Sequence, residues 1–188
     1  NLFYEALRKT DHRFLEIFMR KNFDFQRKFI DNQKETSPFI WTMEKDKKVL
    51  NLLFKKTNLK IIKKLFELEF FKDKNEADLL LISYKYRRFD LLDFFLSKGL
   101  DPSKKGLSGH SLNYLMALRK DVKVLDLLLK HKITLNEKYP FKGVEIDEGD
   151  NFDCTVLFYA MHQKIDSFVL KILNSEFHDL SIKHNDII

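Results

Sequence analysis

Apolar residues recur along this chain at helical spacing, in pairs of short stretches. The first stretches of the pairs span residues 2–7, 49–54, 79–84, 112–118 and 156–161. The second stretches span residues 14–19, 61–66, 91–96, 124–129 and 169–173. Each stretch has the spacing of a short helix with one broad apolar face. The pattern therefore predicts five helical hairpins, and because no hairpin can bury its apolar face alone, neighbouring hairpins should stack.

Residues with helix-capping side chains precede four of the five first helices. They are Asn1, Asp78, Ser111 and Thr155, whereas Lys48 precedes the remaining helix. A side-chain oxygen at this position accepts a hydrogen bond from a backbone N–H of the first turn. We therefore expect these four residues to mark helix starts.

Short motifs before and after the helices resemble those of the ankyrin repeat family. Its opening motif is Thr-Pro-Leu-His-x-Ala and its closing turn is Gly-Ala-Asp-x-Asn. Thr155-Val156-Leu157-Phe158-Tyr159-Ala160 keeps the Thr, Leu and Ala of the opening motif. Lys98-Gly99-Leu100-Asp101-Pro102 is similar to the closing turn, and residues 132–136 are a weaker version. Ser83 and Met116, at matching places in two first helices, are 33 residues apart, which is the ankyrin period.

This resemblance implies an all-α fold, an ankyrin-like helical-hairpin solenoid of about five repeats in a single domain. The expected repeats are residues 1–26, 48–74, 78–104, 111–136 and 155–181, with enlarged hairpin insertions at 27–47 and 137–153. A tetratricopeptide array is the main alternative, but its Trp, Leu-Gly and Tyr signature is absent. In another possible register, residues 37–42 are an opening motif and residues 49–54 a second helix, which leaves an extra helix at 59–71.

The chain departs from the family at the turn inside each hairpin. No aligned opening motif keeps its Pro, and the Gly expected between the two helices is replaced. The replacing residues are Thr10, Thr57, Arg87, Lys120 and Lys164. Since a left-handed backbone is usual at these positions, we expect remodelled or slightly strained turns.

Cations follow the first helices in most repeats. The net charge is +6 and the isoelectric point is near 9.2. Ankyrin folds bind partners on a concave face formed by the ends of the first helices and the hairpin tips. The matching residues are Arg8, Lys9, Lys55, Lys56, Lys85, Tyr86, Arg87, Arg119, Lys120 and His162. Stacked repeats would align them into a basic ridge for an acidic partner. Alternatively, they are solvated helix ends whose cations offset the helix dipole.

Aromatic residues in the two insertions are further candidate contacts. Trp41 lies in the first insertion, and Tyr139 and Phe141 lie in the second. Trp and Tyr are common interface anchors, although such rings can also fix a loop onto the solenoid. The second insertion is acidic between residues 145 and 153, but it lacks the ligand order of a calcium-binding loop.

No arrangement of residues predicts catalysis, a cofactor or a metal site. Cys154 is the only cysteine, and His110, His131 and His162 have no metal-ligand spacing. The chain has neither a phosphate-binding glycine loop nor a nucleophile elbow. A single cysteine favours a reducing compartment, and we expect a cytoplasmic location. The longest apolar runs are too short for a membrane span.

These features predict a non-enzymatic scaffold that binds another protein, and we expect the partner to present an acidic segment to the concave face and hairpin tips. A second hypothesis is a structural repeat segment of a larger polypeptide, such as a channel cytosolic domain or a multidomain effector. It follows from the start at Asn1 rather than Met, from which we expect a fragment of a longer chain. A third hypothesis is nucleic-acid binding through the basic ridge, with affinity that falls as salt rises.

Overall fold

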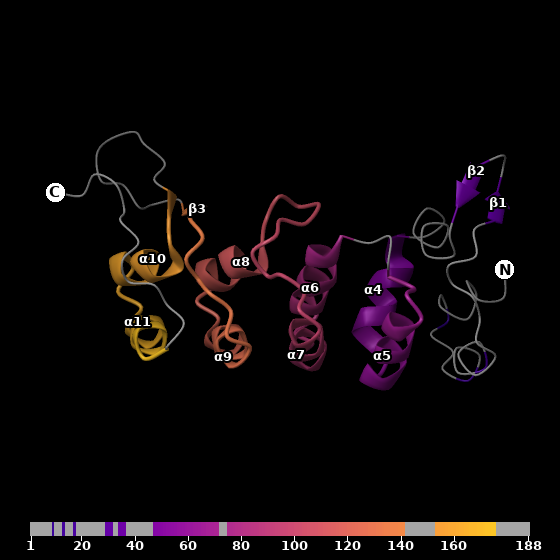
Figure 1. Cartoon of the computed structure of the whole chain (residues 1–188), viewed down its shortest axis with the longest axis horizontal. Coiled ribbons are helices and arrows are strands. Elements are labelled where there is room, and N and C mark those ends of the chain that lie inside the picture. The colour runs from indigo at the N-terminus through magenta and orange to yellow at the C-terminus, as the bar shows by residue number, and fades with distance from the viewer. Residues whose placement is uncertain are drawn as a thin grey trace. The chain divides into compact units, whose positions relative to one another are not determined.

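The described part of the chain is mostly helical in the computed structural model (Figure 1). The structure describes residues 47–71, 75–141 and 153–175, two strands before them, and the single residues Lys9, Arg13 and Ile17. The two strands are β1 (Phe29–Asp31) and β2 (Lys34–Thr36), which pair antiparallel with Phe29 opposite Thr36. The contacts divide the chain into two compact units, Asn1–Phe95 and Leu96–Ile188.

The described residues of the first unit include two consecutive helical hairpins. The first consists of α4 (Lys47–Lys56) and α5 (Leu59–Glu67), and the second consists of α6 (Glu76–Lys85) and α7 (Phe89–Ser97), whose last two residues belong to the second unit. The first helices α4 and α6 pack against each other. This agrees with the register in which residues 49–54 form a first helix.

Two more hairpins lie in the described part of the second unit. They are α8 (Leu112–Leu118) with α9 (Val122–Lys130), and α10 (Val156–His162) with α11 (Asp166–Leu173). The first helices α8 and α10 pack together, and so do the second helices α9 and α11. Strands β3 (Tyr139–Pro140) and β4 (Asp153–Cys154) pair antiparallel between α9 and α10. The eight predicted apolar stretches from residue 49 onward all lie in these helices, whereas residues 2–7 and 14–19 lie outside the continuously described ranges.

Helix caps agree with the prediction at two positions and differ at one. The side chains of Ser111 and Thr155 accept hydrogen bonds from Tyr114 N–H and Phe158 N–H, as expected of N-caps. Asp78 is not a cap. Asn75 caps α6 instead, so the helix begins a turn earlier and Asp78 is a buried residue of its first turn. Asn1 lies outside the described residues.

The turns inside three hairpins have the left-handed backbone that their position requires. The φ angles are 56° at Arg87, 53° at Lys120 and 54° at Lys164. At Lys120, the N–H bonds to Ala117 O and the next N–H bonds to Met116 O, which closes the end of α8. Thr57 differs from the prediction, because it is absent from the residues with positive φ. Asn58 caps α5 directly after it, so the α4–α5 turn is shorter.

Phenylalanines form much of the core of the first unit. Phe54 of α4 lies 5.8 Å from Phe71 and 6.0 Å from Phe95 of α7, measured between ring centroids. Phe66 of α5 lies 5.5 Å from Phe94 and 5.7 Å from Phe95. These ring contacts connect the two hairpins of the unit, because Phe54 and Phe66 belong to one hairpin and Phe94 and Phe95 to the other.

Candidate partner-binding surface

Every described first helix ends in exposed basic side chains. We call the following residues the basic helix ends: Lys55 and Lys56 in the last turn of α4, Lys85 and Arg87 at the end of α6, Arg119 and Lys120 after α8, and His162 and Lys164 at the end of α10. All eight are exposed. Lys164 was not among the predicted contacts, although its left-handed position was predicted. Its equivalence to Arg87 and Lys120 in the turn is the signal that could have identified it.

Aromatic rings hold the basic side chains after α6. The Arg87 guanidinium carbon lies 4.7 Å from the centroid of Phe89 and 5.8 Å from that of Tyr84. The Lys85 amine lies 5.5 Å from the ring of Tyr86, which is half-buried. Cations over aromatic faces are attracted by the ring quadrupole. The rings therefore restrict these two cations while leaving them accessible to an anionic group.

Arg88 connects the ends of α4 and α6, and the sequence analysis missed it. Its Nη1 donates to Phe54 O and Thr57 O, both at 2.8 Å. Its Nε and Nη2 donate to the two carboxylate oxygens of Asp90, at 2.8 and 2.6 Å. The side-chain hydrogen bond from Arg88 lowers the pKa of Asp90 below its ordinary value of 3.8. One guanidinium thus satisfies carbonyls at the end of α4 and fixes the turn after α6 beside them.

This connection brings four of the basic helix ends together in the first unit. Lys55 and Lys56 lie next to the carbonyls that Arg88 holds, while Lys85 and Arg87 lie immediately before Arg88 in the chain. The neighbouring Arg88 charge is neutralised by its bidentate pair with Asp90. The exposed positive charge of this region is therefore carried by the lysines and by Arg87.

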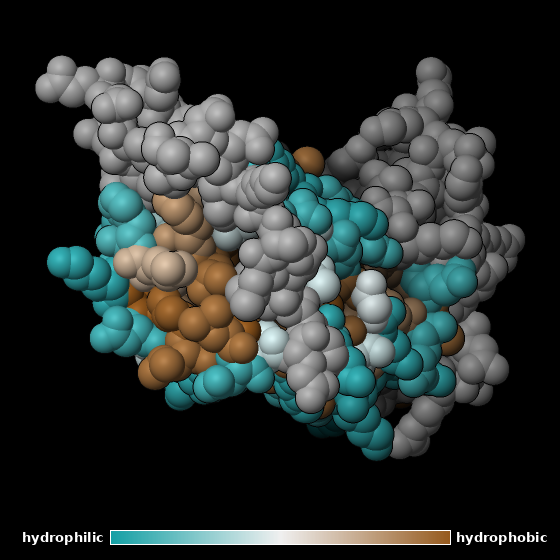
Figure 2. Space-filling view, turned by 60° about the vertical axis from the view of Figure 1, so that its left-hand side comes forward, coloured by the Kyte–Doolittle hydropathy of each residue, from teal (hydrophilic) through white to brown (hydrophobic). Residues whose placement is uncertain are grey.

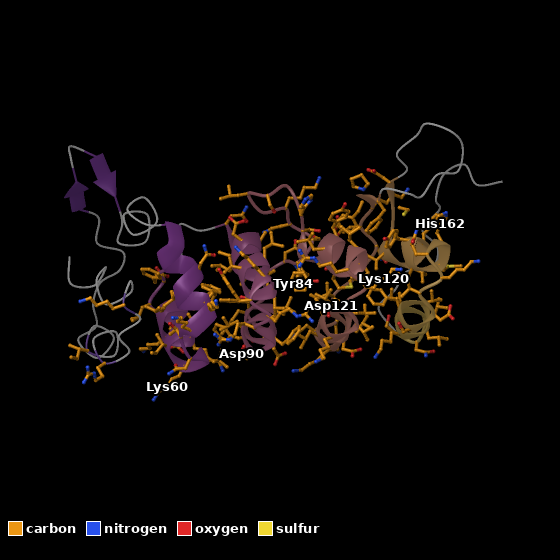
Figure 3. All side chains as sticks on the ribbon, turned by 180° about the vertical axis from the view of Figure 1, so that it is seen from behind. Lys60, Tyr84, Asp90, Lys120, Asp121 and His162 are labelled. Atoms are coloured by element: carbon orange, nitrogen blue, oxygen red, sulfur yellow. The ribbon has the colours of Figure 1, made fainter. Side chains whose placement is uncertain are left out.

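The basic helix ends of the second unit lie at the ends of α8 and α10, which pack together. Figure 3 labels Lys120 and Asp121 at the turn between α8 and α9, and His162 at the end of α10. Asp121 is buried and accepts a hydrogen bond from Val124 N–H as the N-cap of α9. Its carboxylate thus points into the turn, whereas Lys120 and His162 are exposed to solvent.

The aromatic residues of the second insertion are core residues, which corrects their predicted role as partner contacts. Tyr139 is 4% exposed and Phe141 is 1% exposed. The Phe141 ring stacks on Tyr159 of α10 at 4.0 Å and on Tyr114 of α8 at 5.2 Å. Burial raises the pKa of the Tyr139 and Tyr159 hydroxyls. The rings fix the start of the insertion onto two hairpins, so a partner cannot reach them in this conformation.

Other predicted contacts lie at or beyond the edges of the described residues. Lys9 is exposed and helical, while Arg8 and Trp41 lie outside the described residues. Their predicted roles remain predictions.

Residues 103–110 form an exposed loop before α8 that the sequence analysis did not select. Leu107 is 83% exposed, and Lys104 and Lys105 precede it. The Gly106 N–H bonds to His110 O, and the Gly109 N–H bonds to Gly106 O, so the loop has a defined backbone turn. An apolar residue displayed beside two lysines provides both contact area and positive charge. The two glycines that bracket Leu107 are the sequence signal for this exposed turn.

Cys154 has the properties of an unreactive core cysteine. Burial raises the pKa of its thiol to about 12, so the thiol is protonated at neutral pH. Among the described residues, no group of three or more His, Cys, Asp or Glu side chains could hold a metal ion. No described helix has both the length and the apolar character to cross a bilayer.

Comparison with known proteins found no matching family model, no matching curated protein and no matching solved structure.

Proposed function

We propose that this chain is a protein-binding scaffold of stacked, ankyrin-like hairpins, whose basic helix ends contact an acidic segment of a partner. The observation that carries the proposal is the recurrence of exposed basic residues at the ends of α4, α6, α8 and α10. Within each unit, fixed cations at equivalent places in the two hairpins would attract a chain of carboxylates more strongly than isolated cations do.

The backbone fixes the position of three of these cations. Arg87, Lys120 and Lys164 have positive φ, where Gly is the favoured residue. A non-Gly residue in this conformation costs about 1 kcal/mol or more. These three cations are therefore held at turn positions with a defined backbone conformation.

Apolar side chains near the cations of the second unit extend the proposed surface. Leu118 is an exposed residue of the last turn of α8, directly before Arg119. Leu107 lies on the loop that leads into the same helix. A partner segment that alternates acidic and apolar residues would match this combination better than a purely acidic segment would, because it could also bury apolar surface.

The test compares two variants with the same change in charge. In the first, Lys55→Glu, Lys85→Glu and Arg119→Glu reverse basic helix ends. In the control, Lys60→Glu, Lys98→Glu and Lys130→Glu reverse exposed lysines on or after second helices. Circular dichroism establishes that both fold, and nuclease-treated lysate is then passed over each immobilised protein and the captured proteins are quantified.

We expect the control to retain the wild-type set of captured proteins and the first variant to lose it. Equal retention by both variants would refute the role of the basic helix ends. If the wild type captures proteins only from lysate that has not been treated with nuclease, their capture depends on nucleic acid. The proposal is then also wrong, and the surface binds the phosphates of nucleic acid. A linear fall of log affinity with log salt for a defined oligonucleotide would identify that alternative.

A further inference from the structure

The α4–α5 hairpin differs from the other described hairpins in its charge. Residues 47–67 contain seven lysines and one acidic residue, Glu67, so their net charge is +6. In α6–α7, by contrast, acidic residues outnumber basic ones. Since the whole chain also has a net charge of +6, its other residues contain equal numbers of acidic and basic side chains. The rest of the chain therefore has no excess of carboxylates with which to neutralise this hairpin.

Three of these lysines form a stripe along the exposed side of α5. Lys60, Lys63 and Lys64, which we call the α5 lysine stripe, are all exposed. Their spacing of three and four residues places them on one side of the helix, and Figure 3 shows Lys60 projecting away from the ribbon. The opposite side of α5 is buried in the core and consists of Ile61, Ile62 and Leu65. Lys55 and Lys56, which are also exposed, precede α5 at the end of α4 and extend the positive charge.

Interactions within the first unit do little to compensate the stripe. Like charges three and four residues apart on a helix repel each other. No acidic residue lies in the first turn of α5, where the cation of Lys60 opposes the helix dipole. Lys64 pairs with Glu67 at 3.4 Å, but their side chains are 45% and 58% exposed, so this pair contributes little. The Lys63 amine lies 5.3 Å from the centroid of Phe94, a contact that leaves its charge in place. A polyanion outside the chain would therefore stabilise this surface.

The stripe offers charge without apolar contact area. Among the described side chains, no large apolar residue of α4 or α5 is exposed. In Figure 2, exposed apolar side chains instead form a brown surface on the last described hairpin, with Met161, Leu170 and Leu173. Protein partners are held mainly by buried apolar and aromatic side chains, and stable membrane anchoring needs a second, apolar signal beside a basic patch. The phosphates of a nucleic acid, in contrast, are bound by cations alone.

We propose that the α5 lysine stripe, extended by Lys55 and Lys56, binds the phosphate backbone of duplex nucleic acid without reading its sequence. A duplex carries about one negative charge per 1.7 Å of its axis, so each flexible lysine on one helix side can reach a phosphate. Single strands are instead held by bases that stack on aromatic rings, and Phe66 of α5 is packed against the rings of α7. Because the stripe shares no residue with the basic helix ends, this proposal and the protein-binding proposal can fail independently.

The test measures binding of the full chain to a labelled DNA duplex of about 20 base pairs by fluorescence anisotropy, between about 50 and 200 mM salt. The stripe variant carries Lys60→Gln, Lys63→Gln and Lys64→Gln. The matched control carries Lys85→Gln, Arg119→Gln and Lys120→Gln, which remove three exposed cations of the basic helix ends. A third variant, with Lys60→Arg, Lys63→Arg and Lys64→Arg, keeps the charge of the stripe. Circular dichroism establishes that all three fold.

The salt dependence of the affinity gives the expected result. For the wild type, log affinity should fall linearly with log salt with a slope of about −4 to −5, because five lysines displace counterions. The stripe variant should bind at least about tenfold more weakly, with a slope smaller in magnitude by about 3. The control and the arginine variant should keep the wild-type slope within about 1. Equal changes of slope in the stripe variant and the control would overturn the proposal, as would a wild type that does not bind the duplex at the lowest salt.

Three further probes separate a duplex backbone from other targets. A duplex of unrelated sequence should bind within about threefold of the first, because phosphate contacts carry no sequence information. A single strand of the same length should bind more weakly than the duplex. Vesicles of phosphatidylserine and phosphatidylcholine should also bind more weakly at the same concentration of phosphate. Tighter binding of the single strand or of the vesicles that the stripe variant loses would overturn the assignment to a duplex, and strong preference for one duplex sequence would overturn the assignment to the backbone.

Discussion

Each unit connects its own two hairpins by different chemistry, although the helices of both units follow the same pattern of apolar residues. In the first unit, Arg88 bonds to carbonyls at the end of α4, and phenylalanine rings fill the space between the hairpins. In the second unit, Phe141 inserts from outside the helices and stacks between Tyr114 and Tyr159. The repeated apolar spacing thus specifies the helices, while the connection between hairpins depends on single residues that do not repeat.

The largest expected effect concerns the aromatic connection. Phe141→Ala removes a fully buried ring that contacts both α8 and α10, so it should destabilise the second unit by about 3 to 5 kcal/mol. Chemical unfolding followed by circular dichroism measures the loss, and hydrogen exchange localises it. Faster exchange should be concentrated in α8 and α10. A loss below about 1 kcal/mol would show that the ring is not a structural connection.

Removing the Arg88 guanidinium should lower the free energy of unfolding by somewhat less. Arg88→Ala removes two hydrogen bonds to the end of α4 and the pair with Asp90. Hydrogen bonds from charged groups contribute about 1.5 to 3 kcal/mol, and we expect a total loss near 3 kcal/mol in chemical unfolding. Arg87→Ala is the matched control, because Arg87 is the exposed neighbour. Its loss should stay below about 1 kcal/mol, and equal losses would contradict the role of Arg88.

The left-handed turns should respond in opposite directions to opposite substitutions. Lys120→Gly removes a Cβ from a residue with φ of 53° and should stabilise the chain by about 1 kcal/mol. Gly99→Ala adds a Cβ at φ of 81° and should destabilise it by about the same amount, although nothing lies within 4 Å of the added atom. Thermal unfolding of both variants tests the pair. Shifts in Tm of the same sign would show that backbone conformation does not determine how these two substitutions change stability.

The smallest expected effect is the pH dependence of the Arg88–Asp90 pair. The folded pKa of Asp90 is lowered below 3.8, so the pair stabilises the fold above that value and this contribution is lost as the pH falls through the folded pKa. Because the Asp90 side chain is 41% exposed, Asp90→Asn should cost only about 0.5 kcal/mol at pH 7. Chemical unfolding at pH 7 and pH 2.5 measures the difference between variant and wild type, which should shrink at low pH.

Local sequence signals predicted much of the fold. The apolar stretches identified all eight described helices, and the capping residues Ser111 and Thr155 marked two helix starts correctly. The left-handed turns at Arg87, Lys120 and Lys164 followed from alignment to a position that favours Gly. These features depend on residues within about four positions of each other, where spacing and backbone geometry are directly coupled.

Features that depend on distant residues could not be read from the sequence. Arg88 bonds to carbonyls 31 and 34 residues away, and no local pattern distinguishes it from the exposed Arg87. Phe141 was assigned to a partner because it lies in an insertion, yet its stacking partners Tyr114 and Tyr159 belong to two different hairpins. Asp78 was predicted as a cap, whereas Asn75, three positions earlier, caps α6, and only the backbone path distinguishes these two residue positions.

The short β3–β4 pair has a consequence for how this chain can change over evolutionary time. Tyr139 pairs with Cys154 and Pro140 with Asp153, so both ends of the intervening segment are held by the same small ladder. The entropy of closing a loop grows only with the logarithm of its length, and each doubling costs about 0.6 kcal/mol. Insertions and deletions between the two strands should therefore change the free energy of unfolding only slightly. This site is a natural place at which to graft a new sequence without disturbing the hairpins on either side.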